Sequence, residues 1–151
     1  RLLLEVLDAT CAVWGADRVG LRLSPLNSFN SMRDSDPVGL VSWLAGRLNA
    51  YKLAYLHVMR ADFLGQQHGD VLTPARQAYE GVLIGNMGYS PLEAASAVEA
   101  GQLDAVAFGV PFLANPDLPA RIKAGAQLNP ADPGTFYTGG AAGYTDYPFM
   151  Q

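Results

Sequence analysis

Two strand-like segments of this chain end, one after the other, in glycine. Gly85-Asn86-Met87-Gly88 closes the first segment, and Gly109-Val110 closes the next one. Glycine has no side chain, so the backbone amides beside it can approach a bound anion closely. In eight-stranded α/β barrels the loops after the last two strands frequently bind phosphate. The ordered pair of glycines therefore predicts a phosphate site, and the simpler alternative is that each glycine only makes a tight turn.

A second candidate is Arg22, which interrupts an apolar strand-like run. A charged side chain is rarely buried without a partner, so an inward guanidinium needs a carboxylate, a phosphate or an electron-rich ring carbonyl. The alternative is an arginine at a strand end that extends into water. Near the C-terminus, residues 134–148 place aromatic side chains between glycines, a pattern that can line a flat ligand. For Tyr144 and Tyr147 in that segment we favour instead the closed end of a barrel or a subunit contact.

The other reactive side chains form no recognisable motif. His57 lies among apolar residues of a strand-like run, which is typical of a core histidine with its hydrogen bonds satisfied, and His68 lies in a loop. The histidines, Cys11 and the carboxylates do not have the spacing of metal ligands, so we expect no metal site. The nucleophile motif Gly-x-Ser-x-Gly, the Walker loop and the Rossmann glycine motif do not occur.

Strand-like and helical segments alternate along the chain. The strand-like runs cover 18–24, 53–58, 81–86 and 104–109. Helices are expected over 1–14, from Asp36-Pro37 to Asn49, over 73–80, from the capping box Ser90–Glu93 to Gly101, and from Asn115 to Gly125. Such alternation predicts a parallel sheet with its chemistry at the carboxyl ends of the strands. Four βα units are half of an eight-fold barrel.

Bulk composition narrows the class of protein. The chain has 151 residues, of which 50% are hydrophobic, whereas a complete (β/α)8 barrel needs roughly 250. It begins without Met in a segment of helical character, so we expect a part of a longer or divided protein. A net charge of −4 with scattered basic residues argues against nucleic-acid binding. No apolar run is long enough for a membrane span. The single cysteine excludes an internal disulfide and favours a reducing compartment.

Taken in order, these segments resemble the C-terminal half of the old yellow enzyme family, flavin-dependent ene-reductases built on a (β/α)8 barrel. The resemblance covers most of the chain, and its specificity comes from the order and spacing of several pieces. These are Val19-Gly-Leu-Arg-Leu-Ser-Pro25, Phe29-Asn-Ser-Met32, Gly85-Asn86, Asp104-Ala-Val-Ala-Phe-Gly109, Ala114-Asn-Pro-Asp-Leu-Pro119, Thr135-Phe-Tyr137 and Gly143-Tyr-Thr-Asp-Tyr-Pro148.

The resemblance implies roles for residues that would hold the cofactor. Arg22 resembles the arginine that faces the pyrimidine edge of FMN, where its positive charge favours the anionic reduced flavin. Gly85 and Asn86 resemble the first amide pair of the phosphate site, and Gly109 with Val110 resembles the second.

The resemblance also implies a substrate pocket. Phe136 resembles the aromatic residue near the dimethylbenzene end of the flavin, Tyr137 resembles a tyrosine at the substrate mouth, and Phe29 and Phe63 resemble lid or pocket residues. One position departs from the family, which commonly has arginine where this chain has Val110. The lost charge-assisted hydrogen bond is worth about 1.5–3 kcal/mol unless another basic residue replaces it.

The fold implied is α/β, with residues 1–151 forming the C-terminal half, four βα units, of one FMN-binding (β/α)8 TIM barrel. The N-terminal half is absent from this chain. By resemblance that half carries the paired polar residues over the flavin and the proton-donating tyrosine, so no catalytic residue is assigned here. The activity implied is NAD(P)H-driven, FMN-dependent reduction of activated C=C bonds in α,β-unsaturated carbonyl or nitro compounds.

The expected partners are the N-terminal half-barrel, as a separate or cleaved chain, a small-molecule alkene, and a second copy of the chain. We expect neither nucleic acid nor membrane as a partner, and we expect a cytoplasmic location with NADPH as one candidate reductant. Two alternatives stay open. One is a phosphate-binding barrel of another enzyme class, and the other is a non-catalytic half-barrel fragment or assembly module whose open sheet edges pair with another copy.

Overall fold

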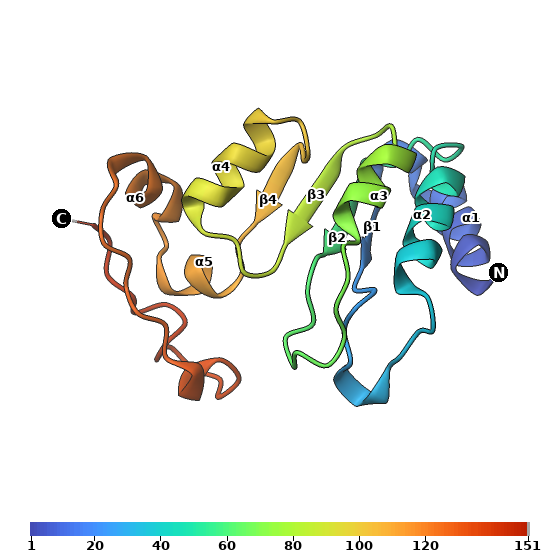
Figure 1. Ribbon diagram of the computed structural model, residues 1–151. Helices are drawn as coiled ribbons and strands as arrows, with labels where there is room; N and C mark the ends of the chain where they lie inside the picture. The colour runs from blue at the N-terminus through green and yellow to red at the C-terminus, as the bar shows by residue number, and fades with distance from the viewer. Residues whose placement is uncertain (151) are drawn as a thin grey trace. The chain divides into compact units, whose positions relative to one another are not determined.

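The structure, a computed structural model, describes residues 1–150 (Figure 1). The chain divides into two compact units, Arg1–Ala107 and a second one that starts at Phe108. The helices and strands of the first unit are α1 (Leu2–Trp14), β1 (Gly20–Leu23), α2 (Pro37–Leu48), β2 (Tyr55–Met59), α3 (Leu72–Ala78), β3 (Leu83–Asn86), α4 (Pro91–Glu99) and β4 (Ala105–Ala107). The second unit holds α5 (Val110–Ala114) and α6 (Leu118–Ala124). Short 3-10 turns lie at Ala16–Arg18, Phe29–Ser31 and Pro133–Thr135.

The four strands form one parallel sheet in the order β1-β2-β3-β4. Each strand pairs with the next one along the chain, and a helix follows each strand in the sequence. The predicted arrangement of four βα units is therefore confirmed, with strands somewhat shorter than the apolar runs. One helix was not predicted. Residues Val110–Ala114 form α5, which is too short to show a helical period, and Pro111 in its first turn is the signal that could have found it.

Side-chain caps fix where two of the helices begin. Asp36 Oδ1 accepts a hydrogen bond from the backbone amide of Gly39 at 2.9 Å, which starts α2 as predicted. Ser90 Oγ accepts one from the amide of Glu93 at 3.1 Å and starts α4. These caps set the lengths of the loops between the carboxyl ends of the strands and the helices that follow.

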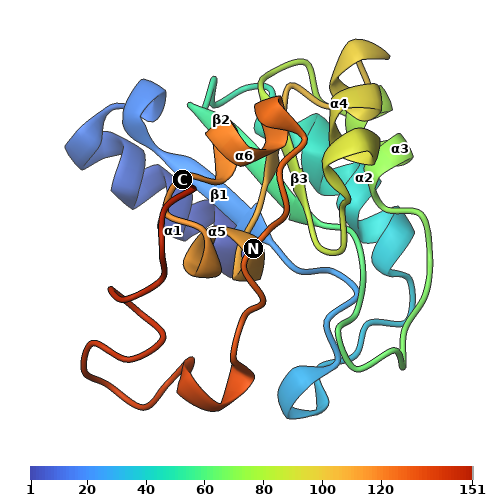
Figure 2. The same cartoon turned by 90° about the vertical axis from the view of Figure 1, so that its left-hand side faces the viewer.

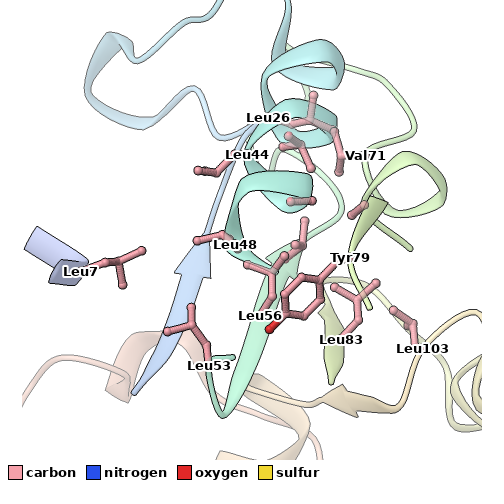
Figure 3. Packing of buried hydrophobic residues seen from close by; sticks show 14 of the residues in the cluster. Leu7, Leu26, Leu44, Leu48, Leu53, Leu56, Val71, Tyr79, Leu83 and Leu103 are labelled. Atoms are coloured by element: carbon pink, nitrogen blue, oxygen red, sulfur yellow. The ribbon is translucent and has the colours of Figure 1, made fainter. Parts of the chain in front are cut away.

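A single apolar core lies on the helix side of the sheet in the first unit (Figure 3). Leu56 and Val58 of β2 and Leu83 of β3 are fully buried, and Leu48 of α2 packs into the same cluster. Tyr79, just after α3, closes the cluster with 2% of its surface exposed. Because successive residues of a strand point to opposite faces, the residues between these core positions must face the other way.

The opposite face of the sheet carries the polar side chains. In the strand register Arg22 lies beside His57, and His57 lies beside Ile84. One row further toward the carboxyl ends, Met59 lies beside Asn86. Arg22 is exposed and His57 is half-buried, whereas the residues on either side of His57 in β2 are buried. The alternation of the strands therefore separates an apolar helix-covered face from a second face, called the polar face here, which carries Arg22, His57 and Asn86 beside Met59 and Ile84.

Candidate functional site

Arg22 has no counter-charge in the first unit. Its Nη2 atom lies 3.7 Å from the sulfur of Met59, a weak contact, and none of the salt bridges among the described residues includes it. The side chain rises from β1 on the polar face, at the same level as His57. The exposed side chain agrees with the second interpretation, an arginine that extends into water, and no carboxylate of this unit pairs with it. A positive charge on this face is left available for an external acceptor.

Two other groups on this face lack partners. His57 Nε2 and Asn86 Oδ1 are buried atoms with no hydrogen-bond partner among residues 1–150. The prediction that His57 is a core histidine with satisfied hydrogen bonds is therefore wrong. Burial lowers the pKa of His57 and the positive charge of Arg22 lowers it further, whereas the polar side chain of Asn86 opposes the shift in part. The imidazole and the amide oxygen thus offer hydrogen-bonding capacity beside a cation.

The turn after β3 contains the first predicted glycine site. A Cβ added at Gly85 would lie 2.6 Å from Leu103 Cδ1 and 3.2 Å from the hydroxyl of Tyr89. The missing side chain of Gly85 is therefore explained by close packing on the helix side. Asn86 points to the polar face, and the next two residues, Met87 and Gly88, have φ of 89° and 70°. Positive φ is unfavourable for methionine, so this turn requires support from outside.

Arg60, at the carboxyl end of β2, provides that support. Its Nε donates to the carbonyl of Met87 at 2.8 Å, and its Nη2 donates to the carbonyl of Gly88 at 2.9 Å. The guanidinium forms a two-point ion pair with Glu93 of α4, with distances of 2.5 and 3.1 Å. Its plane also covers the ring of Tyr89, 3.6 Å from the centroid. One side chain thus fixes both carbonyls of the turn.

Phe29 and Phe63 come from different loops and meet. Phe29 lies in the loop after β1, Phe63 lies in the loop after β2, and their ring centroids are 5.8 Å apart at an interplanar angle of 42°. Both rings are 51% exposed. The two loops run side by side in Figures 1 and 2. Asp62, whose role was not predicted, joins them through its buried carboxylate. Phe29 and Phe63, the two residues expected at a lid or pocket, thus form one exposed aromatic pair.

The remaining predicted residues belong to the second unit. Gly109 precedes α5 with φ −92°, and a Cβ there would meet nothing within 4 Å. Val110 is 48% exposed. Phe136 is half-buried and lines a hollow of about 310 Å³ together with Leu113 and Tyr144, whereas Tyr137 is 98% exposed. The role of Tyr144 and Tyr147 at the closed end of a barrel or in a subunit contact stays a prediction.

Two buried polar residues hold the aromatic segment of the second unit in place. Arg121 pairs with Asp117 at 2.7 Å and donates to the carbonyls of Gln127 at 2.7 Å and Pro148 at 2.9 Å. Asn115 has no exposed surface, and its side-chain oxygen accepts from the amide of Asn129 at 2.7 Å. These bonds attach both ends of the segment that carries Phe136 to the helical part of this unit.

Residues 1–150 contain no group of three or more His, Cys, Asp or Glu side chains that could hold a metal ion. Among the same residues, no helix combines the length and apolar character needed to cross a bilayer.

The sequence profile of the NADH:flavin oxidoreductase / NADH oxidase family matches residues 1–129. The chain belongs to this family. It is 55% identical over 150 residues to a protein of Leishmania infantum described as a probable flavin mononucleotide-dependent alkene reductase, covering 99% of this chain and 41% of that protein.

Solved structures of the family confirm the fold. The old yellow enzyme from Trypanosoma cruzi superposes with a TM-score of 0.97 at 45% identity, covering 99% of this chain and 40% of that one. Morphinone reductase in complex with tetrahydroNAD gives a TM-score of 0.89 at 42% identity, with 99% and 40% covered. The resemblance and the predicted half-barrel of four βα units are thus confirmed. The chain spans about two fifths of the length of the relatives it matches.

The side chains of the first unit fit the flavin that the family name implies. A flavin ring has carbonyl oxygens and nitrogens along its edge. A protein that binds it must supply hydrogen-bond donors and acceptors, and a cation favours the reduced form. The polar face of the sheet offers the unpaired Arg22 guanidinium, the orphaned His57 nitrogen and the orphaned Asn86 oxygen. These unpartnered groups are those that a ring lying on this face would satisfy.

Proposed function

We propose that residues 1–151 are the C-terminal half of a single FMN-binding barrel that reduces activated C=C bonds, in α,β-unsaturated carbonyl or nitro compounds, at the expense of NAD(P)H. The observation that carries the proposal is the group of unpartnered polar side chains on the polar face of the sheet, Arg22 with His57 and Asn86, in a chain of this family. The N-terminal half of the barrel, in the same protein or as a separate or cleaved chain, completes the site.

Each predicted residue has a part in this proposal. Arg22 would face the pyrimidine edge of the ring, where its fixed charge would stabilise negative charge on the reduced cofactor. Backbone amides at Gly85-Asn86 bind the phosphate, with Gly109-Val110 as a second pair of amides. Since Val110 supplies no cation, the second pair binds through the main chain alone.

The aromatic residues shape the entrance. Phe29 and Phe63 form a wall on the substrate side, Phe136 lies at the apolar end of the ring, and Tyr137 lies at the mouth. FMN itself supplies the hydride chemistry when bound. This chain binds and orients the cofactor, and the proton donor to the substrate belongs to the other half of the barrel.

The reductant, location and assembly complete the proposal. Morphinone reductase has been solved with a nicotinamide analogue, which supports NADH or NADPH as electron donor. The single cysteine favours a reducing compartment, and the proposed location is the cytoplasm. We also propose that the complete protein self-associates. Analytical ultracentrifugation tests this, and a monomer mass that stays constant as protein concentration rises would contradict it.

The test uses the full-length protein. Purified protein is expected to carry FMN, seen by its visible absorbance and identified by mass after release. Under anaerobic conditions it should oxidise more than one equivalent of NADPH or NADH per FMN only when 2-cyclohexenone is present. Replacing Arg22 with Met should leave protein folded but lower the flavin reduction potential, because a positive charge beside the reduced ring is lost. Protein that stays colourless with added FMN would contradict the proposal and favour a non-catalytic assembly module or a barrel of another class.

A further inference from the structure

Two oppositely charged residues stand at the carboxyl end of β2, separated by a single alanine. Arg60 and Asp62 do not pair with each other among the interactions of the described residues; each binds a different neighbouring loop. Since β2 lies between β1 and β3 in the sheet, one segment can reach the loops that follow both neighbours. Arg60 binds the turn after β3, and Asp62 binds the loop after β1.

The Asp62 carboxylate accepts four backbone hydrogen bonds. Its Oδ1 accepts from the amides of Ser28 and Leu64, both at 3.1 Å, and its Oδ2 accepts from those of Gln66 at 2.9 Å and Gln67 at 3.1 Å. Ser28 belongs to the loop after β1, and the other three belong to the loop after β2. The residue is 9% exposed; burial by itself would raise the pKa of the carboxyl, but these bonds hold it far below its ordinary value. A single carboxylate therefore organises its own loop and fastens the neighbouring one.

Two further crossing bonds support the same junction. The side-chain amide of Gln67 donates to the carbonyl of Leu26 at 3.1 Å and to that of Met32 at 3.3 Å. These carbonyls lie on either side of Phe29, while Phe63 directly follows Asp62 in the chain. Hydrogen bonds between the two loops therefore occur close to both aromatic residues in the sequence: on either side of Phe29, and at Asp62, directly before Phe63.

The loop after β1 needs such support. Asn30 and Ser31 have φ of 56° and 61°, a left-handed conformation that residues with side chains seldom adopt. Consecutive residues of this kind persist only when their surroundings determine the backbone. Asp62 and Gln67 supply bonds on both sides of this turn, so the conformation of Phe29 depends on a residue of another loop.

We propose that Arg60 and Asp62 form a two-sided clamp that positions the two ends of the active site separately. Arg60 shapes the phosphate-binding turn at Asn86–Gly88, and Asp62 joins two loops into one lid that presents Phe29 and Phe63 to the substrate. The proposal rests on the function proposed above. Both are positioning residues, because neither needs to touch the cofactor or the substrate.

The clamp predicts separable effects in the full-length protein. FMN and riboflavin differ only by the phosphate, so the ratio of their dissociation constants isolates the phosphate end. Arg60→Met should reduce the preference for FMN over riboflavin by about 10-fold, with the KM for 2-cyclohexenone unchanged. Arg60→Lys keeps the charge but not the forked geometry, so it should lose a smaller part of that preference and provides a second variant if the first does not fold.

Asp62→Asn should have the complementary effect. The amide keeps one acceptor oxygen and turns an NH2 group toward two backbone donors, which frees the loops without changing side-chain size. The KM for 2-cyclohexenone should rise about 10-fold while the preference for FMN over riboflavin is unchanged. Asp70→Asn is the matched control, since Asp70 accepts from the amides of Leu72 and Thr73 within its own segment only.

Hydrogen exchange gives a readout that needs no flavin. In the apoprotein, Asp62→Asn should raise amide exchange in both 26–35 and 62–68, whereas Asp70→Asn should raise it only near 71–74. Exchange confined to 62–68, or the same kinetic parameter shifted by Arg60→Met and Asp62→Asn, would overturn the clamp. A wild-type protein without preference for FMN over riboflavin would overturn the proposed phosphate site together with the role of Arg60. Whether Asp62 joins the two loops is still decided by hydrogen exchange in 26–35 and 62–68, because that measurement does not depend on flavin binding.

Discussion

Replacing Gly85 with Ala tests why glycine ends β3. A Cβ at this position would lie 2.6 Å from Leu103 Cδ1, closer than side-chain carbons approach in real structures, and 3.2 Å from the hydroxyl of Tyr89. Leu103 is 3% exposed and belongs to the apolar core, so its methyl group cannot move into solvent. The substitution therefore forces one extra methyl group into a packed region.

The expected loss of stability follows from two opposing effects. Adding a methyl group to a well-packed core costs about 1–3 kcal/mol. Replacing glycine with alanine reduces the entropy of the unfolded chain and returns about 0.4–1 kcal/mol. From the middle of both ranges, Gly85→Ala should lower the free energy of unfolding by about 1.3 kcal/mol, and by at most about 2.6 kcal/mol.

The assay is urea unfolding followed by far-UV circular dichroism, with Gly109→Ala as the control. Gly109 has φ −92° and no atom within 4 Å of an added Cβ, so its substitution should change stability by less than about 0.5 kcal/mol. Combining Gly85→Ala with Leu103→Val removes a methyl group near the clash. The two changes should then be non-additive, with Gly85→Ala less costly by about 0.5 kcal/mol or more when Leu103→Val is already present.

A neutral Gly85→Ala variant with no coupling to Leu103 would refute the packing argument. The remaining reason for glycine at this position would then be the other interpretation of the sequence, close approach of the backbone to an anion. In that case Gly85→Ala should weaken FMN binding more than riboflavin binding. The same variants therefore distinguish packing against Leu103 from close approach of the backbone to the phosphate.

Three further outcomes are expected. Leu56→Ala, at a fully buried position of β2, should lower the free energy of unfolding by about 2–5 kcal/mol in a denaturant titration, and a smaller loss would show that the site collapses around the cavity. Ser90→Ala removes the acceptor for the Glu93 amide and should cost about 1 kcal/mol in the same assay, while Ser90→Asp should not. Because burial and the charge of Arg22 lower the pKa of His57, the unfolded state binds a proton first as pH falls below about 6.5. Wild type should therefore lose more stability than His57→Gln between pH 7.5 and pH 5.5, and parallel curves would contradict this.

Much of the fold could be predicted because each element has a local cause. Parallel strands are buried by helices and appear as short apolar runs, which is why 53–58 and 81–86 lie within two residues of β2 and β3. Asp36 and Ser90 cap helices through bonds to residues three positions later, a distance visible in any sequence. Helix α5 escaped prediction because five residues are too few to show a period.

The site was only partly predictable, because its key contacts depend on the order of the strands. Arg60 binds a turn 27 and 28 residues away, and Asp62 binds Ser28 from 34 residues away. Neither pairing is visible until β2 is known to lie between β1 and β3.

The error on His57 has a different cause, since the necessary signal was present in the sequence. Its immediate neighbours, Leu56 and Val58, are apolar, and this composition favoured a core histidine. Those neighbours are fully buried because they point to the helix side, and the period of two in a strand sends residue 57 to the opposite face, next to Arg22. A polar residue between two buried apolar residues of a strand is therefore a candidate for the face that binds ligands. The residues directly before and after it point to the opposite face of the sheet, so their apolar character says nothing about the surroundings of its own side chain.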